Sequence, residues 1–391
     1  MDIYEKSLRA HKKSKGKIAI VSKVNLETKE DLSTYYSPGV AGVSSYLAKN
    51  PKEAYKYTSI NNSVAVVSDG SSVLGLGNIG PEGALPVMEG KAILFKKFAN
   101  IDAFPIVLNT QDPEKIIETV LNIAPSFGGI NLEDFSAPNC FRIEDELKKK
   151  LTIPVMHDDQ HGTAVVVLAG LLNACKVTGR ELRFARIVII GAGAAGVAIA
   201  KLLHEYGQRL SSDGNGSGPM IFAVDSKGLI HRGRKNLNES KKRLLEFTNL
   251  SNNDCSVDLI VNGADIIIGV SGPGNITAKM VHDMAEDPIV FALANPEPEI
   301  LPEDAKAAGA AIVATGRSDY PNQVNNVLAF PGLFRGALDT NSAITDDKKI
   351  MAAEAIANIV KNPSANEIIP SPLNPLVVDA VSAVFYNQKN K

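Results

Sequence analysis

Two pairs of adjacent carboxylates, Glu133-Asp134 and Asp158-Asp159, are the residues of this sequence best suited to chemistry. Each pair follows a short apolar run typical of a buried strand, and ligand sites of open α/β sheets lie beyond the carboxyl ends of strands. We therefore expect both pairs to face one crevice, where their charges repel unless a cation or protons intervene. Oxygen ligands suit Mg²⁺ or Mn²⁺ better than zinc. A single pair would be interpreted as a helix cap or a loop carboxylate, but two pairs at strand ends predict a metal site.

Two histidines, His157 and His161, flank the second acidic pair at i, i+4 spacing. On a regular helix this spacing places both rings on one face, as in some zinc sites. We do not expect a regular helix before Gly162. Structural hydrogen bonding is therefore favoured over a ligand role for both histidines.

A lysine and a tyrosine are candidates for proton transfer. Lys91 lies in the otherwise apolar run from Met88 to Phe95, and desolvation near a metal lowers the pKa of a lysine and makes it a usable base. The alternative is a lysine that runs along a helix surface with its amine in solvent. Tyr36 lies in the turn YSPGV, where its phenol is exposed. Taken alone, Tyr36 would be a packing aromatic.

A glycine-rich turn follows the apolar run Arg186–Ile190 and precedes an apolar helix. Its pattern is G-x-G-x-x-G: Gly191 permits the tight turn, Gly193 lets the backbone approach a pyrophosphate, and Gly196 allows close helix–strand packing. The helix N-terminus supplies N–H groups for the anion. Glycines that merely pack a helix on a strand are the alternative. Dinucleotide binding is favoured because the turn lies between a strand and a helix.

The next strand ends at Asp225, whose carboxylate is placed to bond a ribose hydroxyl. The spacing exceeds the usual ~20 residues, and the polar loop Ser211–Pro219 accounts for the surplus. Asp225 alone favours NAD, because a carboxylate repels a 2′-phosphate. Four following residues are candidates to neutralise that phosphate: Ser226, Lys227, Arg232 and Arg234. The sequence therefore leaves the preference between NAD and NADP open.

The composition excludes several classes of protein. Hydrophobic residues make up 45% of the chain and charged residues 21%, which excludes disorder. A net charge of −2 is too balanced for a nucleic-acid binder, and the Lys-rich segment Arg9–Lys17 lacks interleaved aromatics, so we expect a solvated element beside a dimer contact. The longest uncharged apolar run, Ile187–Ala200, is shorter than the ~18 residues of a membrane span.

The termini and cysteines give further limits. The N-terminus has no apolar signal core, and Cys140, Cys175 and Cys255 have neither a disulfide nor a zinc-ribbon pattern. We therefore expect a soluble cytoplasmic protein without nucleic-acid or membrane partners.

Short apolar runs alternate with longer amphipathic stretches, which predicts a doubly wound α/β protein with parallel sheets. The predicted strands are Ser63–Ser68, Ala103–Leu108, Gly129–Leu132, Ile153–Met156, Arg186–Ile190, Ile221–Val224, Asp265–Gly269, Ile289–Leu293 and Ala311–Val313. The predicted helices are Pro113–Ile123, Ile143–Leu151, Thr163–Val177, Ala194–Tyr206, Leu237–Phe247, Asp346–Val360 and a short final helix.

The 391 residues correspond to two or three domains at about 150 residues each. We expect a boundary between Gly162 and Gly179, because a strand, a glycine turn and a helix begin a new sheet there. The predicted units are an N-terminal α/β domain, residues 1–161, that binds substrate and metal, and a Rossmann-like dinucleotide-binding domain with a helical end, residues 162–391.

Ten motifs in order along residues 10 to 385 resemble the malic enzymes, in their short microbial form. They are YSPGV from Tyr36, SDG from Ser68, LGLGNIG from Leu74, Gly90-Lys91, LEDF from Leu132, HDDQHGT from His157, GAGAAG from Gly191, DSKGLI from Asp225, ANPEPE from Ala294 and QVNN from Gln323.

The resemblance implies oxidative decarboxylation of (S)-malate to pyruvate and CO₂, with NAD or NADP and with Mg²⁺ or Mn²⁺. It implies Lys91 as general base, Tyr36 as general acid and Asp158 as a residue that tunes Lys91. It implies that metal ligands are Glu133, Asp134 and Asp159, and that malate contacts include Asn295, Asn325 and Asn326. The implied dinucleotide contacts are Gly191, Ala192, Gly193, Ala194, Ala195, Gly196, Asp225, Ser226, Lys227, Ser271 and Asn295. A homodimer is also implied.

One position departs from the family. Longer malic enzymes have an arginine two residues after the Asp-Gly motif, where it binds a malate carboxylate, and this chain has Ser72 there. We expect backbone N–H groups of this loop, at Ser72 and Val73, to bind the carboxylate instead.

Two other functions compete with this interpretation. A malate dehydrogenase or malolactic-type enzyme shares the hydride step but has no net oxidative decarboxylation. A dinucleotide-sensing regulator would keep the glycine turn but lose Lys91 or the carboxylates, and this chain keeps both.

Overall fold

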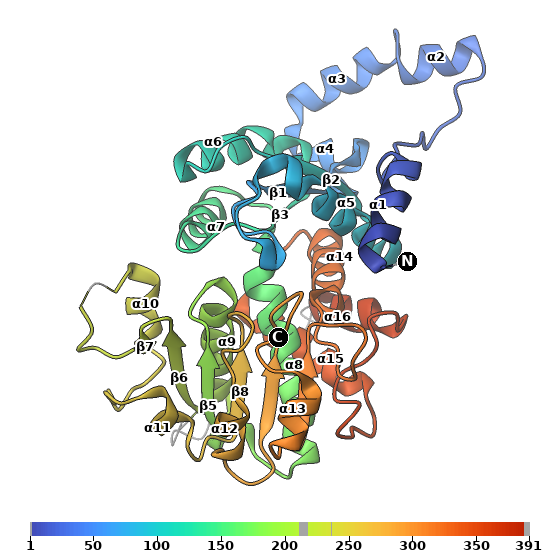
Figure 1. Ribbon diagram of the computed structural model, residues 1–391. Helices are drawn as coiled ribbons and strands as arrows, with labels where there is room; N and C mark the ends of the chain where they lie inside the picture. The colour runs from blue at the N-terminus through green and yellow to red at the C-terminus, as the bar shows by residue number, and fades with distance from the viewer. Residues whose placement is uncertain (1, 211–217, 236, 387–391) are drawn as a thin grey trace.

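The computed structural model describes residues 2–210, 218–235 and 237–386 and contains two parallel sheets (Figure 1). The predicted loop Ser211–Pro219 lies outside the described residues except for its last two. The expected two-unit α/β architecture is confirmed.

The first sheet has the order β2-β1-β3-β4. Its strands are β1 (Ser63–Ser68), β2 (Asp102–Val107), β3 (Gly129–Leu132) and β4 (Val155–His157), and all pairs are parallel. Leu132 pairs with His157. Glu133 directly follows β3 and Asp158 directly follows β4, so both lie at the same edge of the sheet, as predicted from the sequence.

The second sheet has the order β10-β9-β8-β5-β6-β7. Its strands are β5 (Arg186–Ile190), β6 (Met220–Asp225), β7 (Gly228–Leu229), β8 (Ile266–Gly269), β9 (Ile289–Ala292) and β10 (Ile312–Thr315). The strand order reverses between β5 and β8, so a crevice opens there at the carboxyl edge. All nine predicted strands exist. One further strand, β7, was not predicted. It is antiparallel and only two residues long, too short for an apolar run to indicate it.

Helices flank both sheets. Between the strands lie α5 (Gly80–Ala99), α6 (Pro113–Ile123), α7 (Asn139–Lys150), α8 (Asp158–Val177), α9 (Ala194–Leu210), α10 (Glu239–Leu244), α11 (Val257–Val261), α12 (Ala278–His282) and α13 (Pro302–Ala307). The chain ends in α14 (Phe330–Thr340), α15 (Asp346–Ile359) and α16 (Leu376–Tyr386).

Helix α8 joins the two sheets and begins five residues earlier than predicted, at Asp158. Asp158 and Asp159 occupy its first turn, where negative charge favours the N-terminal end of the helix dipole. Gly162, expected to precede the helix, lies inside it. A Cβ there would lie 1.9 Å from Asp158 Oδ1, so the glycine makes room for that carboxylate.

Helix α14 follows the second sheet in sequence but packs on the first unit. The Phe95 ring of α5 lies 4.7 Å from Phe330 and 5.4 Å from Phe334, measured between centroids. The two units therefore share a continuous apolar core.

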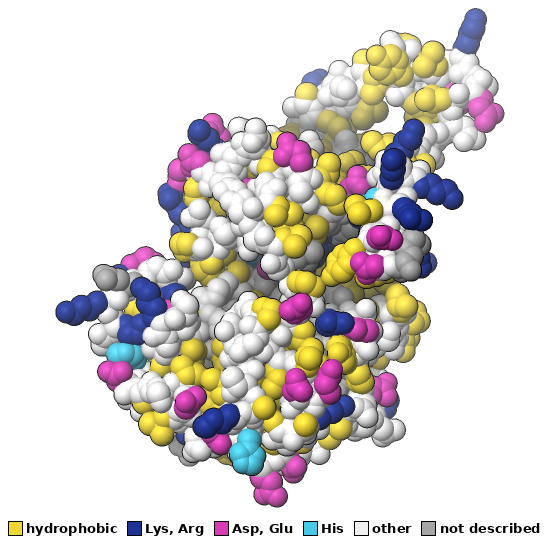
Figure 2. Space-filling view, in the orientation of Figure 1, with side chains coloured by type: hydrophobic (Ala, Val, Ile, Leu, Met, Phe, Trp, Pro, Cys, Tyr) yellow, Lys and Arg dark blue, Asp and Glu magenta, His cyan; other side chains and the backbone are white. Residues whose placement is uncertain are grey.

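The N-terminal arm, residues 2–57, contains α1 (Ile3–Ser14), α2 (Lys29–Tyr35), α3 (Val40–Lys49) and α4 (Ala54–Tyr57). Helices α2 and α3 extend away from the body, with α3 joining it near α4 (Figure 1). None of α1, α2 and α3 has a buried residue, and apolar side chains lie on their surface (Figure 2). Across the described ranges, no helix is long and apolar enough to cross a membrane.

Candidate active site

A cavity of about 1340 Å³ lies between the carboxyl ends of the two sheets, and we call it the central cavity. Lys91, Glu133 and Asp159 line it from the first unit, and Ala194 and Val270 line it from the second. The fold thus brings the acidic pairs and the glycine turn to one space.

Lys91 projects from α5 into a buried ion-pair cluster. Its Nζ lies 2.5 Å from Asp158 Oδ2 and 2.7 Å from Glu133 Oε1, and 4.3 Å from the centroid of the Phe330 ring. Lys91 is only 9% exposed. Its amine is therefore directed inward, which excludes the alternative of a lysine extended into solvent.

The lowered pKa expected for Lys91 beside a metal stays a prediction, and the carboxylates around the amine act in the opposite direction. Burial lowers the pKa of the ammonium group, but Asp158 and Glu133 raise it more, so the net direction is upward. The sequence indicated the desolvation but not that two carboxylates would contact the amine.

The carboxylate of Asp158 is held by two side chains. It is fully buried, and its Oδ2 accepts a hydrogen bond from Asn326 Nδ2 at 3.2 Å as well as the Lys91 contact. Thr163 Oγ1 donates to Asn326 Oδ1 at 3.1 Å. Asn326, expected as a malate contact, thus also orients the carboxylate beside Lys91, and Thr163 is a supporting residue that the sequence analysis missed.

The other carboxylates lie beside this pair. Glu133 and Asp134 are each 5% exposed, and Asp159 Oδ2 accepts the backbone N–H of Asp134 at 2.8 Å. Burial, followed by repulsion from Asp159 and Asp158 against the opposing pull of Lys91, raises the pKa of Glu133. Three carboxylates, those of Glu133, Asp158 and Asp159, act on the single ammonium group of Lys91, so acidic groups outnumber basic groups in the cluster.

This excess charge and the all-oxygen donor set fit a divalent cation. The ligands are not pre-arranged: no group of three or more His, Cys, Asp or Glu side chains is placed to hold a metal within residues 2–210, 218–235 and 237–386. Glu133 is paired with Lys91 and Asp159 with the Asp134 amide. Metal binding by these three residues would therefore require them to exchange partners.

Of the two histidine rings, that of His161 makes the expected structural hydrogen bonds and that of His157 does not, within the part of the chain that the structure describes. His161 lies on α8, where its Nε2 is 2.8 Å from Glu144 Oε2 and its Nδ1 is 3.0 Å from Lys349 Nζ. Burial lowers the pKa of His161 to about 3. Its structural hydrogen bonding is confirmed. His157 is fully buried, and neither ring nitrogen has a hydrogen-bond partner among the described residues.

The role of backbone N–H groups at the malate carboxylate stays a prediction, and the structure shows both expected donors hydrogen-bonded within the chain. The amide of Ser72 donates to Asp134 O and that of Val73 to Gly77 O, each at 2.9 Å. Both N–H groups are therefore already used. Ser72 lines the central cavity through its exposed residue surface, whereas Val73 is fully buried.

The remaining predicted substrate residues line the central cavity. Asn295 follows β9, and Asn325 precedes the short turn at Asn326. Tyr36 is not brought to this cavity by its own chain: it lies at the end of α2 in the arm, is 69% exposed, and is not among the described lining residues.

The glycine turn is built as predicted. Gly191 has a φ of +124°, and a Cβ on it would lie 2.4 Å from Val270 O after β8. A Cβ on Gly196 would lie 1.8 Å from Gly191 O. Gly193 has no heavy atom within 4 Å of a Cβ position, so its face is open. The turn is therefore packed on two sides and free on the third.

A second cavity of about 610 Å³, the glycine-turn cavity, continues from this open face. Predicted dinucleotide residues that line it are Gly191, Ala192, Gly193, Asp225, Ser226 and Ser271. Ala194, Ala195 and Asn295 line the central cavity. Gly193 and Ser271 line both, so the two cavities are contiguous.

Asp225 is already hydrogen-bonded through its carboxylate to other residues of its own chain. Its carboxylate accepts hydrogen bonds from the Lys227 amide at 2.8 Å, from Arg234 at 2.9 Å through each oxygen, and from Lys241 at 2.7 Å. Burial raises the pKa of Asp225, but these donors lower it to about 2. Arg232 instead donates to backbone carbonyls, so its expected role at a 2′-phosphate is not supported. The sequence analysis missed Lys241, sixteen residues beyond Asp225.

A Rossmann-type sheet whose glycine turn opens into the same cavity as a lysine–carboxylate cluster defines a dinucleotide-dependent oxidoreductase. The chain matches the family model "Malic enzyme, N-terminal domain" over residues 13–148 and "Malic enzyme, NAD binding domain" over residues 160–382. It therefore belongs to the malic enzyme family, whose members use NAD or NADP and a divalent metal.

Individual relatives agree. The bifunctional malic/malolactic enzyme of Bacillus subtilis is 54% identical over 386 residues, which cover 98% of this chain and 92% of that protein. The NAD-dependent malic enzyme of Geobacillus stearothermophilus is 53% identical, over 94% of this chain and 75% of that protein. The crystal structure of an NAD-dependent malic enzyme from Thermotoga maritima matches with a TM-score of 0.92 at 47% identity, over 99% of both chains.

Proposed function

We propose that this chain oxidises and decarboxylates (S)-malate to pyruvate and CO₂ while it reduces NAD⁺ or NADP⁺. One observation carries the proposal: Lys91 and Glu133 line the same cavity as Ala194 at the start of α9, directly after the glycine turn. A base and a hydride acceptor must both reach C2 of malate, and this cavity is where both can do so.

Glu133, Asp134 and Asp159 are proposed to hold the divalent cation. When bound, it supplies a Lewis acid that binds the substrate oxygens and stabilises the negative charge left by loss of CO₂. A dinucleotide held at the glycine turn would supply the acceptor for the hydride of C2.

The chain's own residues move the protons. Lys91 takes the C2 hydroxyl proton as a neutral amine, having first given its ammonium proton to solvent in the open cavity. Ligation of a metal by Glu133 would remove one of the two carboxylates that stabilise the ammonium form. Asp158, fixed by Asn326, keeps the Lys91 amine in place. Asn295 and Asn325 are proposed to donate amide hydrogen bonds to the malate carboxylates. Tyr36 gives a proton to C3 of enolpyruvate.

Tyr36 is proposed to serve a partner chain in a homodimer. The arm that carries it exposes Ile20 (91%), Val21 (80%) and Leu32 (52%), and an apolar surface of this kind marks a contact with another chain. A dimer that covers the arm would bring Tyr36 to the central cavity of the second copy. Light scattering of the purified protein tests the dimer itself.

Mixed dimers test the shared site. Tyr36→Phe and Lys91→Ala chains are each unfolded and refolded together, with each variant refolded alone as the control. If Tyr36 acts across the dimer, each heterodimer regains one complete site, and the mixture recovers about a quarter of wild-type activity. If the mixture is no more active than the two variants apart, Tyr36 does not serve the partner.

The reaction is tested by following reduced nicotinamide with (S)-malate and Mn²⁺, separately with NAD⁺ and NADP⁺. An EDTA control and detection of pyruvate accompany the assay. Metal-dependent reduction with an equal amount of pyruvate is expected. Reduction that yields oxaloacetate without pyruvate would refute decarboxylation.

A malolactic-type reaction is the second candidate, since the B. subtilis relative is named for both activities. In that reaction the bound reduced cofactor would return its hydride to pyruvate, so that lactate is released and the cofactor is oxidised again. Lactate formed without net accumulation of NADH or NADPH would favour it over the main proposal.

The proposed domain division is residues 1–161 and 162–391, with α14 packed back on the first unit. A cytoplasmic location, as expected from the sequence, is proposed as well. Fluorescence microscopy of a tagged chain in its host would test the location.

A further inference from the structure

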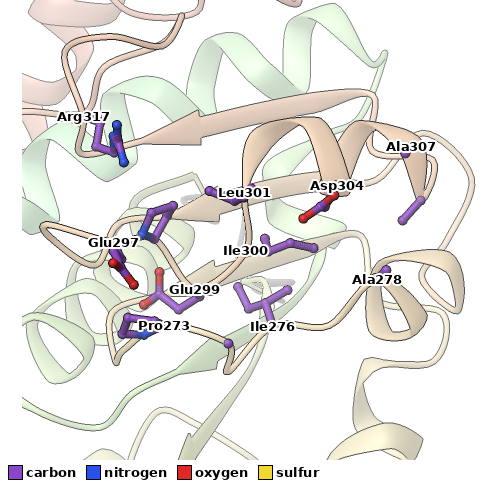
Figure 3. Close-up of a pocket in the computed structure, with 13 residues that line it drawn as sticks. Pro273, Ile276, Ala278, Glu297, Glu299, Ile300, Leu301, Asp304, Ala307 and Arg317 are labelled. Carbon is purple, nitrogen blue, oxygen red and sulfur yellow. The ribbon is translucent and has the colours of Figure 1, made fainter.

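Glu299 is a fully buried carboxylate that the reaction proposed above does not use. It belongs to the segment between β9 and α13, within the ANPEPE motif, and Figure 3 shows it beside Pro273 and Ile276. A Cβ on Gly269 would lie 2.5 Å from its Cδ atom, so the glycine that ends β8 leaves room for the carboxylate. A buried charge is costly unless its oxygens are satisfied.

The two oxygens of Glu299 bind two different loops. Oε1 accepts the backbone N–H of Ser271 at 2.7 Å, and Oε2 accepts the backbone N–H of Ala294 at 3.0 Å. Ser271 is the second residue after β8, and Ala294 is the second residue after β9. One side chain therefore bridges the ends of two adjacent parallel strands.

The main chain of Glu299 strengthens the same bridge. Its carbonyl oxygen accepts the N–H of Gly274 at 2.9 Å and that of Ile276 at 3.4 Å. The loop after β8 is thus tied to Glu299 through both the side chain and the backbone.

These two loops carry candidate binding residues. Ser271 lines both the glycine-turn cavity and the central cavity, and Asn295, next to Ala294, lines the central cavity. Glu299 therefore joins a loop that lines the proposed dinucleotide site to a loop that lines the proposed malate site, and it sets the distance between them.

We propose that Glu299 is a positioning residue that fixes Ser271 and Asn295 relative to each other, so that dinucleotide and malate bind in the correct relative position. The inference rests on the proposed function for the identity of the substrate. The bridge between the loops and its effect on dinucleotide binding do not depend on the reaction.

Glu299→Gln is the sharpest test. Both carboxylate oxygens face N–H donors, so the amide of glutamine places its NH₂ group against one donor in either orientation and can hold only one loop. Glu303→Gln on α13 is the matched control, because Glu303 is exposed and the substitution is the same. Glu299→Asp keeps the charge but is one carbon shorter, and it replaces Glu299→Gln if that variant does not fold.

NADH affinity is measured by fluorescence without malate, and KM for malate and for dinucleotide are measured with kcat. We expect both KM values and the NADH dissociation constant to rise about tenfold in Glu299→Gln, the size of losing one buried charge-assisted hydrogen bond, with kcat reduced less. The Glu303→Gln control should match wild type.

A variant with a lowered melting temperature but unchanged KM values and NADH affinity would overturn the proposal, since Glu299 would then be structural only. If the wild-type protein binds NADH but does not oxidise malate, the proposed function is wrong. The comparison of NADH affinity between wild type and Glu299→Gln still tests the bridge between the two loops.

Discussion

Replacement of Gly193 by alanine separates dinucleotide binding from folding in this chain. Gly193 has no heavy atom within 4 Å of an added Cβ, and its φ is not among the positive values of the chain. The added methyl group therefore enters the open face of the turn, which lines both cavities. It occupies the space through which the pyrophosphate is proposed to approach the backbone.

The magnitude follows from the same geometry. Without strain, Gly193→Ala is expected to leave the free energy of unfolding unchanged or to raise it by about 0.4–1 kcal/mol, because alanine restricts the unfolded chain. Gly196→Ala is the contrasting variant, since its Cβ would lie 1.8 Å from Gly191 O. A backbone shift must relieve that overlap, and we expect a loss of about 1–3 kcal/mol.

The assay combines urea unfolding with NADH affinity measured by fluorescence. Gly193→Ala should fold normally and bind NADH at least tenfold more weakly, which corresponds to about 1.4 kcal/mol. Gly196→Ala should lose stability. A Gly193→Ala protein that is stable and binds NADH as tightly as wild type would refute the assignment of this face to the pyrophosphate.

Three further predictions concern the charged groups. Lys241→Gln removes an ammonium group that is paired with Asp225 in the glycine-turn cavity. This positive charge would attract a 2′-phosphate, so kcat/KM for NADP should fall several-fold more than kcat/KM for NAD; equal losses would exclude Lys241 as a 2′-phosphate contact. Asp159→Ala should raise the Mn²⁺ concentration for half-maximal activity at least tenfold, with Glu303→Ala as control, and an unchanged requirement would remove Asp159 from the ligands. Burial and repulsion from Lys148, against the pull of Asp346 and Glu144, lower the pKa of Lys349 to about 8. The unfolded chain therefore binds more protons between pH 8 and 10, and stability should rise with pH there, by at most about 3 kcal/mol. Lys349→Met should flatten that rise in urea unfolding, and a wild-type slope in the variant would contradict the assignment.

Local sequence determined the strands and the glycine turn. Apolar runs bounded by polar residues specified nine strands, because strands buried on both faces need such runs. The turn from Gly191 to Gly196 could be predicted because each glycine meets a steric requirement of the strand–turn–helix unit itself. Helix starts were predicted less well: α8 begins at Asp158, where two acidic side chains in the first turn interact favourably with the helix dipole. Apolar periodicity does not report this charge effect.

Tertiary structure decided how these residues meet. The sequence named Lys91, Glu133 and Asp158, but only the packing of α5 on the first sheet placed the Lys91 amine within 2.7 Å of both carboxylates and so raised its pKa instead of lowering it. The hydrogen bonds of Asp225 with Arg234 and Lys241, and the bridge made by Glu299, likewise join residues of different structural elements. No local sequence pattern encodes the distance between such elements in the folded chain.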